Sequence, residues 1–219
     1  MKRIAIFTLA LIFTACASNH YTVKEEFKID IKSQFIEVGV VEAQFDKVLG
    51  IGGLKTTEVT VNYYPREDVV CLLYRTDFIT YHQFWSKRGR DVFISALSKY
   101  KEDYTERNLT KNSRKNKMKY GVIQSFLSWQ GFSFSMRSNG HPDIELGYYF
   151  KEKSPFFTIN QRSTTDFEAD QGDRRTTPDV MIYMTIAQAE ETAALFDPEY
   201  LNALAGNKSG VSDVIYDDY

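Results

Sequence analysis

Histidine is scarce in this chain of 219 residues. The three histidines, His20, His82 and His141, lie far apart in sequence, and no two of them have the short spacing of metal ligands. Zinc sites draw their ligands mainly from clusters of histidine and cysteine. We therefore expect no metal site, and nothing in the sequence indicates a cofactor.

Cysteine is equally rare, with only Cys16 and Cys71 present. Cys71 lies in the apolar run 69–73, which predicts a buried and unreactive thiol. If Cys16 is covalently modified, no intramolecular disulfide can form. The fold must then be stabilised by its hydrophobic core, unlike small secreted domains that depend on disulfides.

Several catalytic and ligand-binding motifs are missing. No G-x-S-x-G nucleophile elbow occurs. The glycine-rich segment 49–54 lacks the Lys-Ser/Thr pair of a phosphate-binding loop. The acidic loop 164–178 lacks the glycine and the final glutamate of a calcium-binding EF-hand. We assign no catalytic residue from the sequence, which favours a binding module over an enzyme.

An excess of charge of one sign is also missing. Removing the first 15 residues, which include Lys2 and Arg3, leaves 25 basic and 29 acidic residues and a net charge of −4. A near-neutral chain is not a general nucleic-acid binder. Hydrophobic residues make up 43% of the chain, which predicts a packed core, and the aromatic content of 15% favours β-strands.

The N-terminus has the three parts of an export signal. Lys2 and Arg3 are followed by an uncharged apolar run over 4–13, which is too short to span a bilayer as a helix. The small residues Thr14 and Ala15 then precede Cys16. A buried core helix would not explain this order.

The four residues 13–16, Phe-Thr-Ala-Cys, resemble the lipobox of bacterial lipoproteins. The resemblance implies cleavage between Ala15 and Cys16, diacylglycerol on the Cys16 sulfur and acylation of the new amino group. It places the protein in the bacterial cell envelope, held on a membrane by lipid. Phe13 replaces the usual aliphatic residue, as in the relaxed lipoboxes of spirochaetes, and Ala17 resembles sorting to the outer membrane or cell surface.

The chain divides into four parts: a signal peptide (1–15), a lipidated cysteine with a tether (16–30), a single α+β domain (31–206) and a flexible tail (207–219). One helix is expected over 86–104, capped by Ser86. A second begins after Thr185, restarts at Asp197 and Pro198, and ends near Gly206. Strands followed by helices predict a mainly antiparallel sheet with two principal helices.

Expected strands follow from alternating or continuous apolar runs. A strand–strand–helix order occurs in each half of the chain, which suggests two β-β-α half-units. The strands are expected over 57–63, 69–74 (continuing towards 79), 120–135, 144–150, 155–160 and 180–184, with 34–48 ambiguous.

Aromatic side chains in the second half form one candidate interaction surface. Consecutive rings on a strand point to opposite faces of a sheet, so one ring of each pair must face something other than the main core. The alternative is that all of these rings belong to the core. The residues concerned are Trp129, Tyr148, Tyr149, Phe156 and Phe157.

A basic run without any acidic residue forms a second candidate. It is either a patch for anionic lipid headgroups, glycan or nucleic acid, or an ordinary solvated loop. The loop interpretation is favoured because charged loops are common on surfaces, and nucleic acid is disfavoured by the envelope location. The run comprises Arg107, Lys111, Arg114, Lys115, Lys117 and Lys119.

Taken together, these features predict a lipid-anchored, non-enzymatic binding or interaction module of the cell envelope, whose partner is a membrane and an unidentified envelope component. The alternatives are an envelope hydrolase, with a site assembled from scattered carboxylates, and a purely structural envelope protein.

Overall fold

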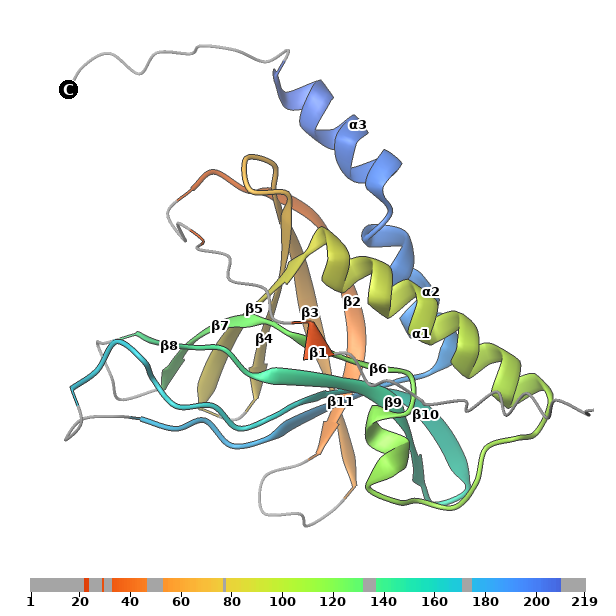
Figure 1. The fold of residues 1–219 in the computed structure, drawn as a ribbon. Coiled ribbons are helices and arrows are strands. Elements are labelled where there is room, and N and C mark those ends of the chain that lie inside the picture. The colour runs from red at the N-terminus through yellow and green to blue at the C-terminus, as the bar shows by residue number, and fades with distance from the viewer. Residues whose placement is uncertain are drawn as a thin grey trace, which may run out of the picture.

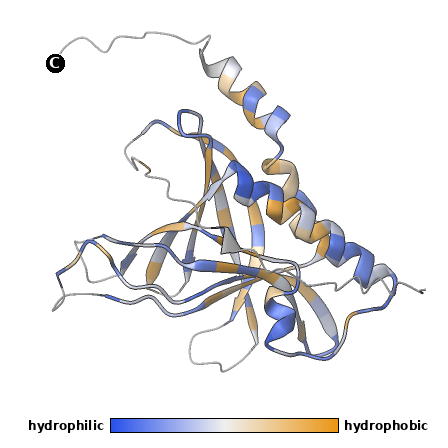
Figure 2. Ribbon diagram, viewed as in Figure 1, coloured by the Kyte–Doolittle hydropathy of each residue, from blue (hydrophilic) through white to orange (hydrophobic). Residues whose placement is uncertain are grey.

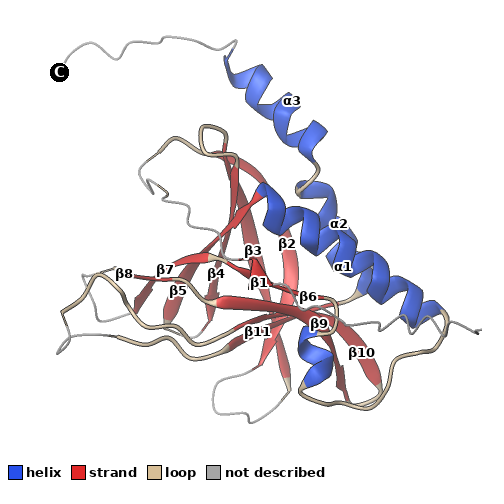
Figure 3. Ribbon diagram, viewed as in Figure 1, coloured by secondary structure: helices blue, strands red, loops and turns tan. Residues whose placement is uncertain are grey.

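The computed structural model describes residues 22–23, 29, 33–46, 53–76, 78–131, 137–170 and 175–209. These residues form one mainly antiparallel sheet and three α-helices, which confirms the predicted α+β class (Figures 1 and 3). The predicted signal peptide, Cys16 and the last ten residues lie outside the described residues.

Eleven strands are found in the described part of the chain. Their order across the sheet is β1-β6-β9-β10-β11-β2-β3-β4-β5-β7-β8, and every neighbouring pair is antiparallel except β1 with β6. The strands are β1 Thr22–Val23, β2 Ile36–Asp46, β3 Leu54–Tyr64, β4 Val69–Thr76, β5 Ile79–Ser86, β6 Gly121–Gln124, β7 Phe126–Gly131, β8 Ser138–Gly140, β9 Asp143–Lys151, β10 Ser154–Gln161 and β11 Val180–Met184.

The sheet curls so that β6 and β7, which lie near opposite ends of the strand order, follow one another in the chain over residues 121–131. Only Ser125 separates β6 from β7, yet β6 pairs with β9 at one end of the order and β7 pairs with β5 at the other. The backbone N–H of Ser125 donates to the carbonyl of Pro142 (3.1 Å), and its hydroxyl donates to the carbonyl of Phe84 (2.7 Å). The break is therefore bonded on both sides, and the sheet acquires an inner and an outer face.

Most predicted strands are present, but β5 was not foreseen. The prediction that the strand at 69–74 continues towards Ile79 is wrong, because the chain reverses between Thr76 and Ile79 and returns antiparallel to β4. The residues between them are Asp77 and Phe78, so neither glycine nor proline marks the turn. The strand expected over 120–135 is likewise interrupted at Ser125.

The helices are α1 Lys87–Thr105, α2 Ile186–Leu195 and α3 Pro198–Ser209. Ser86 caps α1 by accepting a hydrogen bond from the N–H of Gly89, and Thr185 forms a capping box with Gln188, as predicted. The predicted helix end near Gly206 is wrong, because α3 continues to Ser209. Among the described residues, no helix is both long and apolar enough to cross a bilayer.

The main core lies between the inner face of the sheet and the helices. Figure 1 shows α1 and α2 packed side by side across the curled sheet, and Figure 2 shows apolar stretches where they meet. The Phe93 ring of α1 contacts the rings of Trp85, Phe157 and Phe196, with centroids 5.2–5.9 Å apart. These edge-on contacts connect β5, β10, α1 and the end of α2 in one cluster.

Polar groups bridge the inside of the sheet. Gln161 of β10 accepts hydrogen bonds from the Tyr74 hydroxyl (2.8 Å) and the Gln83 amide (3.0 Å), and Gln83 accepts one from the Trp85 indole (2.9 Å). Burial raises the pKa of Tyr74 well above its usual range, so this hydroxyl remains a donor. The network joins β4 and β5 to β10, which are far apart in the strand order.

One buried cation attaches α1 to the sheet. Arg90 is 1% exposed, and its guanidinium donates to the carbonyl of Asp68 (2.8 Å), to the Asp68 carboxylate (2.6 Å) and to the carbonyl of Trp85 (3.3 Å). Asp68 adopts a left-handed backbone conformation with φ of 50°. Arg90 therefore fixes the β3–β4 turn against the first turn of α1.

We predict that Arg90→Ala lowers the free energy of unfolding by about 3 kcal/mol. The carbonyls of Asp68 and Trp85 would lose their hydrogen-bond donor, and the Asp68 carboxylate would lose its ion pair. Arg88→Ala, on the exposed side of the same helix turn, should change it by less than about 0.5 kcal/mol. Urea denaturation of both variants measures the difference. Equal effects would show that the Arg90 contacts do not stabilise the fold.

Candidate functional site

The structure separates the five aromatic residues of the predicted interaction surface. Trp129, Tyr148 and Phe157 are buried in the main core, on the inner face of the sheet. Tyr149 and Phe156 are paired across β9 and β10 and lie on the outer face, half-buried. The alternation of strand side chains thus places one ring of each pair inside, and only Tyr149 and Phe156 remain available to a partner.

Tyr149 and Phe156 contact a third outer-face ring, Tyr183 of β11. The centroids are 6.3 Å and 6.2 Å from that of Tyr183, both edge-on. Lys151 lies 4.7 Å from the Tyr183 centroid and pairs with Asp46 (2.5 Å), which also accepts the Tyr183 hydroxyl (2.7 Å). We call these five residues the Tyr183 cluster. Burial, together with the Asp46 hydrogen bond, raises the pKa of Tyr183 above its usual range.

The segment 106–119, which we call the connector, runs beside this cluster from α1 towards β6. It contains a short 3-10 helix, η2 (Lys115–Met118). The Asn112 side chain makes two hydrogen bonds with the backbone of Phe150, at 2.7 Å and 2.8 Å. The Tyr148 hydroxyl accepts from the N–H of Thr110 (3.1 Å). The connector is therefore attached to β9 at several points, although most of its side chains are exposed.

A glycine permits the closest of these contacts. A Cβ atom at Gly147 of β9 would lie 2.0 Å from the carbonyl oxygen of Asn116 and 2.4 Å from the carbonyl carbon of Lys117. The backbone of η2 therefore lies directly on the outer face of β9. The buried Asn116 side chain holds the connector's own backbone by donating to the carbonyl of Lys111 (2.8 Å).

The cations of the basic run differ in their surroundings. Lys119 pairs with Asp103 (2.7 Å) and lies over the Tyr120 and Tyr148 rings. Lys117 lies 5.4 Å from the Tyr149 centroid, which joins the connector to the Tyr183 cluster. Four cations of the basic run are exposed and form no ion pair with any described residue: Arg107, Lys111, Arg114 and Lys115.

A second outer-face cluster was not predicted. Tyr64, Phe84 and Phe126 follow one another across β3, β5 and β7 with centroids 5.5–5.6 Å apart, and Cys71 lies among them. At its ends lie two rings that are about half exposed, Phe35 at 50% and Phe167 at 48%. The residues come from distant segments, so no local sequence pattern identifies this row of rings.

His82 and the Cys71 thiol lie on this face but lack the properties of catalytic groups. Burial, assisted by the nearby Arg137 guanidinium, lowers the pKa of His82 to about 4. Cys71 is buried, as predicted, and burial raises the pKa of its thiol well above the usual range. Both side chains are therefore neutral at pH 7.

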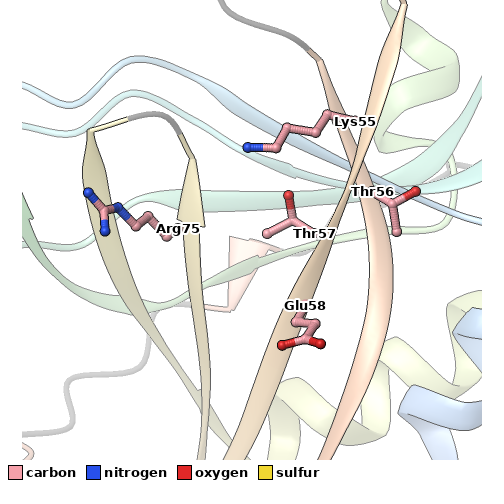
Figure 4. Close-up of a pocket in the computed structure, with 5 residues that line it drawn as sticks. All are labelled: Lys55, Thr56, Thr57, Glu58 and Arg75. Atoms are coloured by element: carbon pink, nitrogen blue, oxygen red, sulfur yellow. The ribbon is translucent and has the colours of Figure 1, made fainter.

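A shallow, open depression lies where β3 begins and β4 ends. Figure 4 shows Lys55 and Thr57 on β3 and Arg75 on β4, with the Lys55 and Arg75 side chains extending to the same side in this view. Glu58 and Thr56 complete its lining. Lys55, Arg75 and Glu58 are exposed, so the depression has no enclosed wall that would desolvate a ligand. We assign no site to it.

The described residues contain no group of three or more histidine, cysteine, aspartate or glutamate side chains able to hold a metal ion. Ser98 and Lys101 have the S-x-x-K spacing found in some acyl-transfer enzymes. Both are exposed on α1, and Lys101 is engaged with Glu190 of α2. Neither side chain therefore lies in the kind of desolvated pocket that activates a nucleophile.

Comparison with known protein families identifies one match. A family model described as "Uncharacterised Treponema protein" matches residues 17–203, which is most of the chain. The chain belongs to this family. No curated protein and no solved structure matches it. The matched range includes every strand in the part of the chain that the structure describes, together with α1, α2 and the connector, so the surfaces described above lie within the matched part.

We predict that Gly147→Ala destabilises this Treponema family protein by at least about 2 kcal/mol, because a methyl group has no space beneath η2. A matched control is Gly206→Ala, where no atom lies within 4 Å of the added Cβ and the helical backbone should gain up to about 1 kcal/mol. Urea unfolding followed by circular dichroism compares the two variants. Similar stability of both would contradict the close contact between η2 and β9.

We also predict a pH dependence of stability due to His82. Its pKa is about 4 in the folded protein, against an ordinary value of 6.5, so between these values the unfolded chain binds the proton more readily. The contribution of His82 to the free energy of unfolding is complete above pH 6.5 and is lost as the pH falls towards 4. Between these pH values the Tm should fall more steeply with decreasing pH in the wild type than in His82→Gln. An identical pH dependence of Tm in both proteins would count against the assignment.

Proposed function

We propose that this protein is a lipid-anchored lipoprotein of the bacterial cell envelope that acts as a non-enzymatic binding module. The anchor is supported by the order of Lys2-Arg3, the apolar run 4–13 and the small residues before Cys16. Acyl chains on Cys16 would supply the membrane attachment, since each buried methylene contributes about 0.8 kcal/mol. The membership in a Treponema family accords with the spirochaete-like Phe13 of the lipobox.

The observation that carries the binding function is the presence of aromatic rings on the outer face of the sheet. The inner face and the helices already form a complete core. A sheet face turned to water is usually polar, whereas this one bears the Tyr183 cluster and the row from Phe35 to Phe167. Most of these rings are buried, but those of Phe35, Phe167, Tyr149 and Phe156 are partly exposed, which favours contact with a partner.

The carboxylates give less support to a hydrolase. The pKa of the Asp103 carboxylate is shifted below its usual range. Burial raises its pKa, but hydrogen bonds from Lys119 and Tyr120 outweigh burial and lower it. A general acid at neutral pH needs a raised pKa instead, so this carboxylate has the properties of a structural group.

We also propose that the domain consists of two half-units, each a run of antiparallel strands followed by a helix. Support comes from the order of elements, because β2 to β5 precede α1 and β6 to β11 precede α2. Each half contains more strands than the two that the sequence suggested. The strand pairs β5–β7 and β11–β2 would then be the joints between the halves.

The anchor is tested by Cys16→Ala in cells grown with labelled palmitate. The wild-type protein should incorporate the label and remain with membranes after high-salt washing, whereas the variant should do neither. Cys71→Ala is the matched control, because the Cys71 thiol is buried and should not be acylated. Unchanged membrane attachment of Cys16→Ala would refute the lipid anchor.

A further inference from the structure

We propose that the connector is a docking surface for anionic phospholipid headgroups of the same membrane that carries the Cys16 anchor. This inference rests on the proposed function, because it takes the lipid on Cys16 as the primary attachment. It adds a second contact that orients the domain, with the connector and the Tyr183 cluster facing the bilayer.

The first argument is the charge of the connector. From Arg107 to Lys119 the chain carries six cations and no acidic residue. Lys119 is neutralised by Asp103, and Lys117 lies against the Tyr149 ring. Four exposed cations remain without an acidic partner among the described residues, on a chain whose net charge is −2. The positive charge is therefore local, as expected for a patch that meets an anionic surface.

The second argument is that the fold holds this charge in place. The hydrogen bonds of Asn112 with Phe150, the Tyr148–Thr110 contact and the close packing of η2 on Gly147 attach the connector to β9. Exposed loops without a structural role do not need such attachments. The binding of four cations to a planar surface loses less conformational entropy when the backbone that carries them is already fixed.

The third argument is the position of the anchor. β1 is parallel to β6, with Thr22 opposite Val122, so β1 begins beside the end of β6 that follows Lys119. Cys16 is six residues before Thr22, and an extended chain of that length spans at most about 20 Å. The acyl chains must therefore enter the membrane within that distance of this edge of the sheet, which the connector also borders.

The aromatic rings beside the connector suit the same environment. Tyr149 and Phe156 are partly exposed, and Lys117 and Lys151 lie over the Tyr149 ring. Tyrosine rings and lysine side chains combine an apolar body with a polar end, which is the combination enriched at membrane interfaces. The surface therefore pairs electrostatic attraction with side chains that tolerate the headgroup region.

The test measures contact between the connector and the bilayer in the full lipidated protein. Asn108→Cys places a fluorophore on the exposed connector without changing its charge, since Cys16 is acylated and Cys71 is buried. The labelled protein is inserted into vesicles of phosphatidylcholine alone or of phosphatidylcholine with phosphatidylglycerol, each containing a headgroup quencher. We expect much stronger quenching with phosphatidylglycerol, decreasing as salt is added.

Two charge variants distinguish local from general electrostatics. Arg114→Gln with Lys115→Gln removes two connector cations, and should weaken docking to the anionic vesicles roughly 25-fold, or about fivefold for each cation. Arg66→Gln with Arg88→Gln removes two exposed cations elsewhere, Arg88 being at the far end of α1, and should leave quenching unchanged. Equal quenching in both kinds of vesicle, or equal loss in both variants, would overturn the proposal.

Failure of the anchor gives a different result. If Cys16 is not acylated, labelled palmitate is absent from the protein, and the proposed function fails before quenching is measured. If Cys16 is acylated and quenching does not depend on phosphatidylglycerol, the anchor stands and the docking surface is refuted.

Discussion

The fold depends on the ability of one stretch of chain to pair in two directions. Residues 121–131 form β6 and β7, the second strand from each end of the strand order, and the change of partner takes place at Ser125. Its backbone N–H and its hydroxyl each bond a carbonyl of a neighbouring segment, so the break leaves these groups paired. Without this closure the sheet would have long open edges. One face would then not be enclosed as the core while the other forms the surface.

Closure determines what the outer face can be used for. Because α1, α2 and the inner rings fill the main core, the aromatic side chains on the other face belong to separate clusters. The Tyr183 cluster is covered in part by Lys117 and Lys151, and the row between Phe35 and Phe167 is exposed at its ends. Both surfaces follow from the strict alternation of side chains along strands.

The sequence predicted the local features well. The caps at Ser86 and Thr185, the restart at Pro198 and the strand 180–184 depend on neighbouring residues, and the structure confirms them. Features that depend on distant residues were missed: the reversal before β5, the row of rings and the attachment of the connector. In particular, the role of Gly147 cannot be recognised without knowing that Asn116 lies over it.

A flexible basic loop and a fixed one differ in what they can contribute to binding. A flexible loop attracts an anionic surface but must be ordered when it binds, and this cost offsets part of the attraction. The connector has already been ordered by Asn112, Asn116 and the contact with Gly147, at the expense of folding and not of binding. Its cations also have a fixed direction relative to β9. A lipid chain alone tethers a domain without orienting it, so a second rigid contact is the feature that would give this domain a defined face towards the membrane and another towards its surroundings.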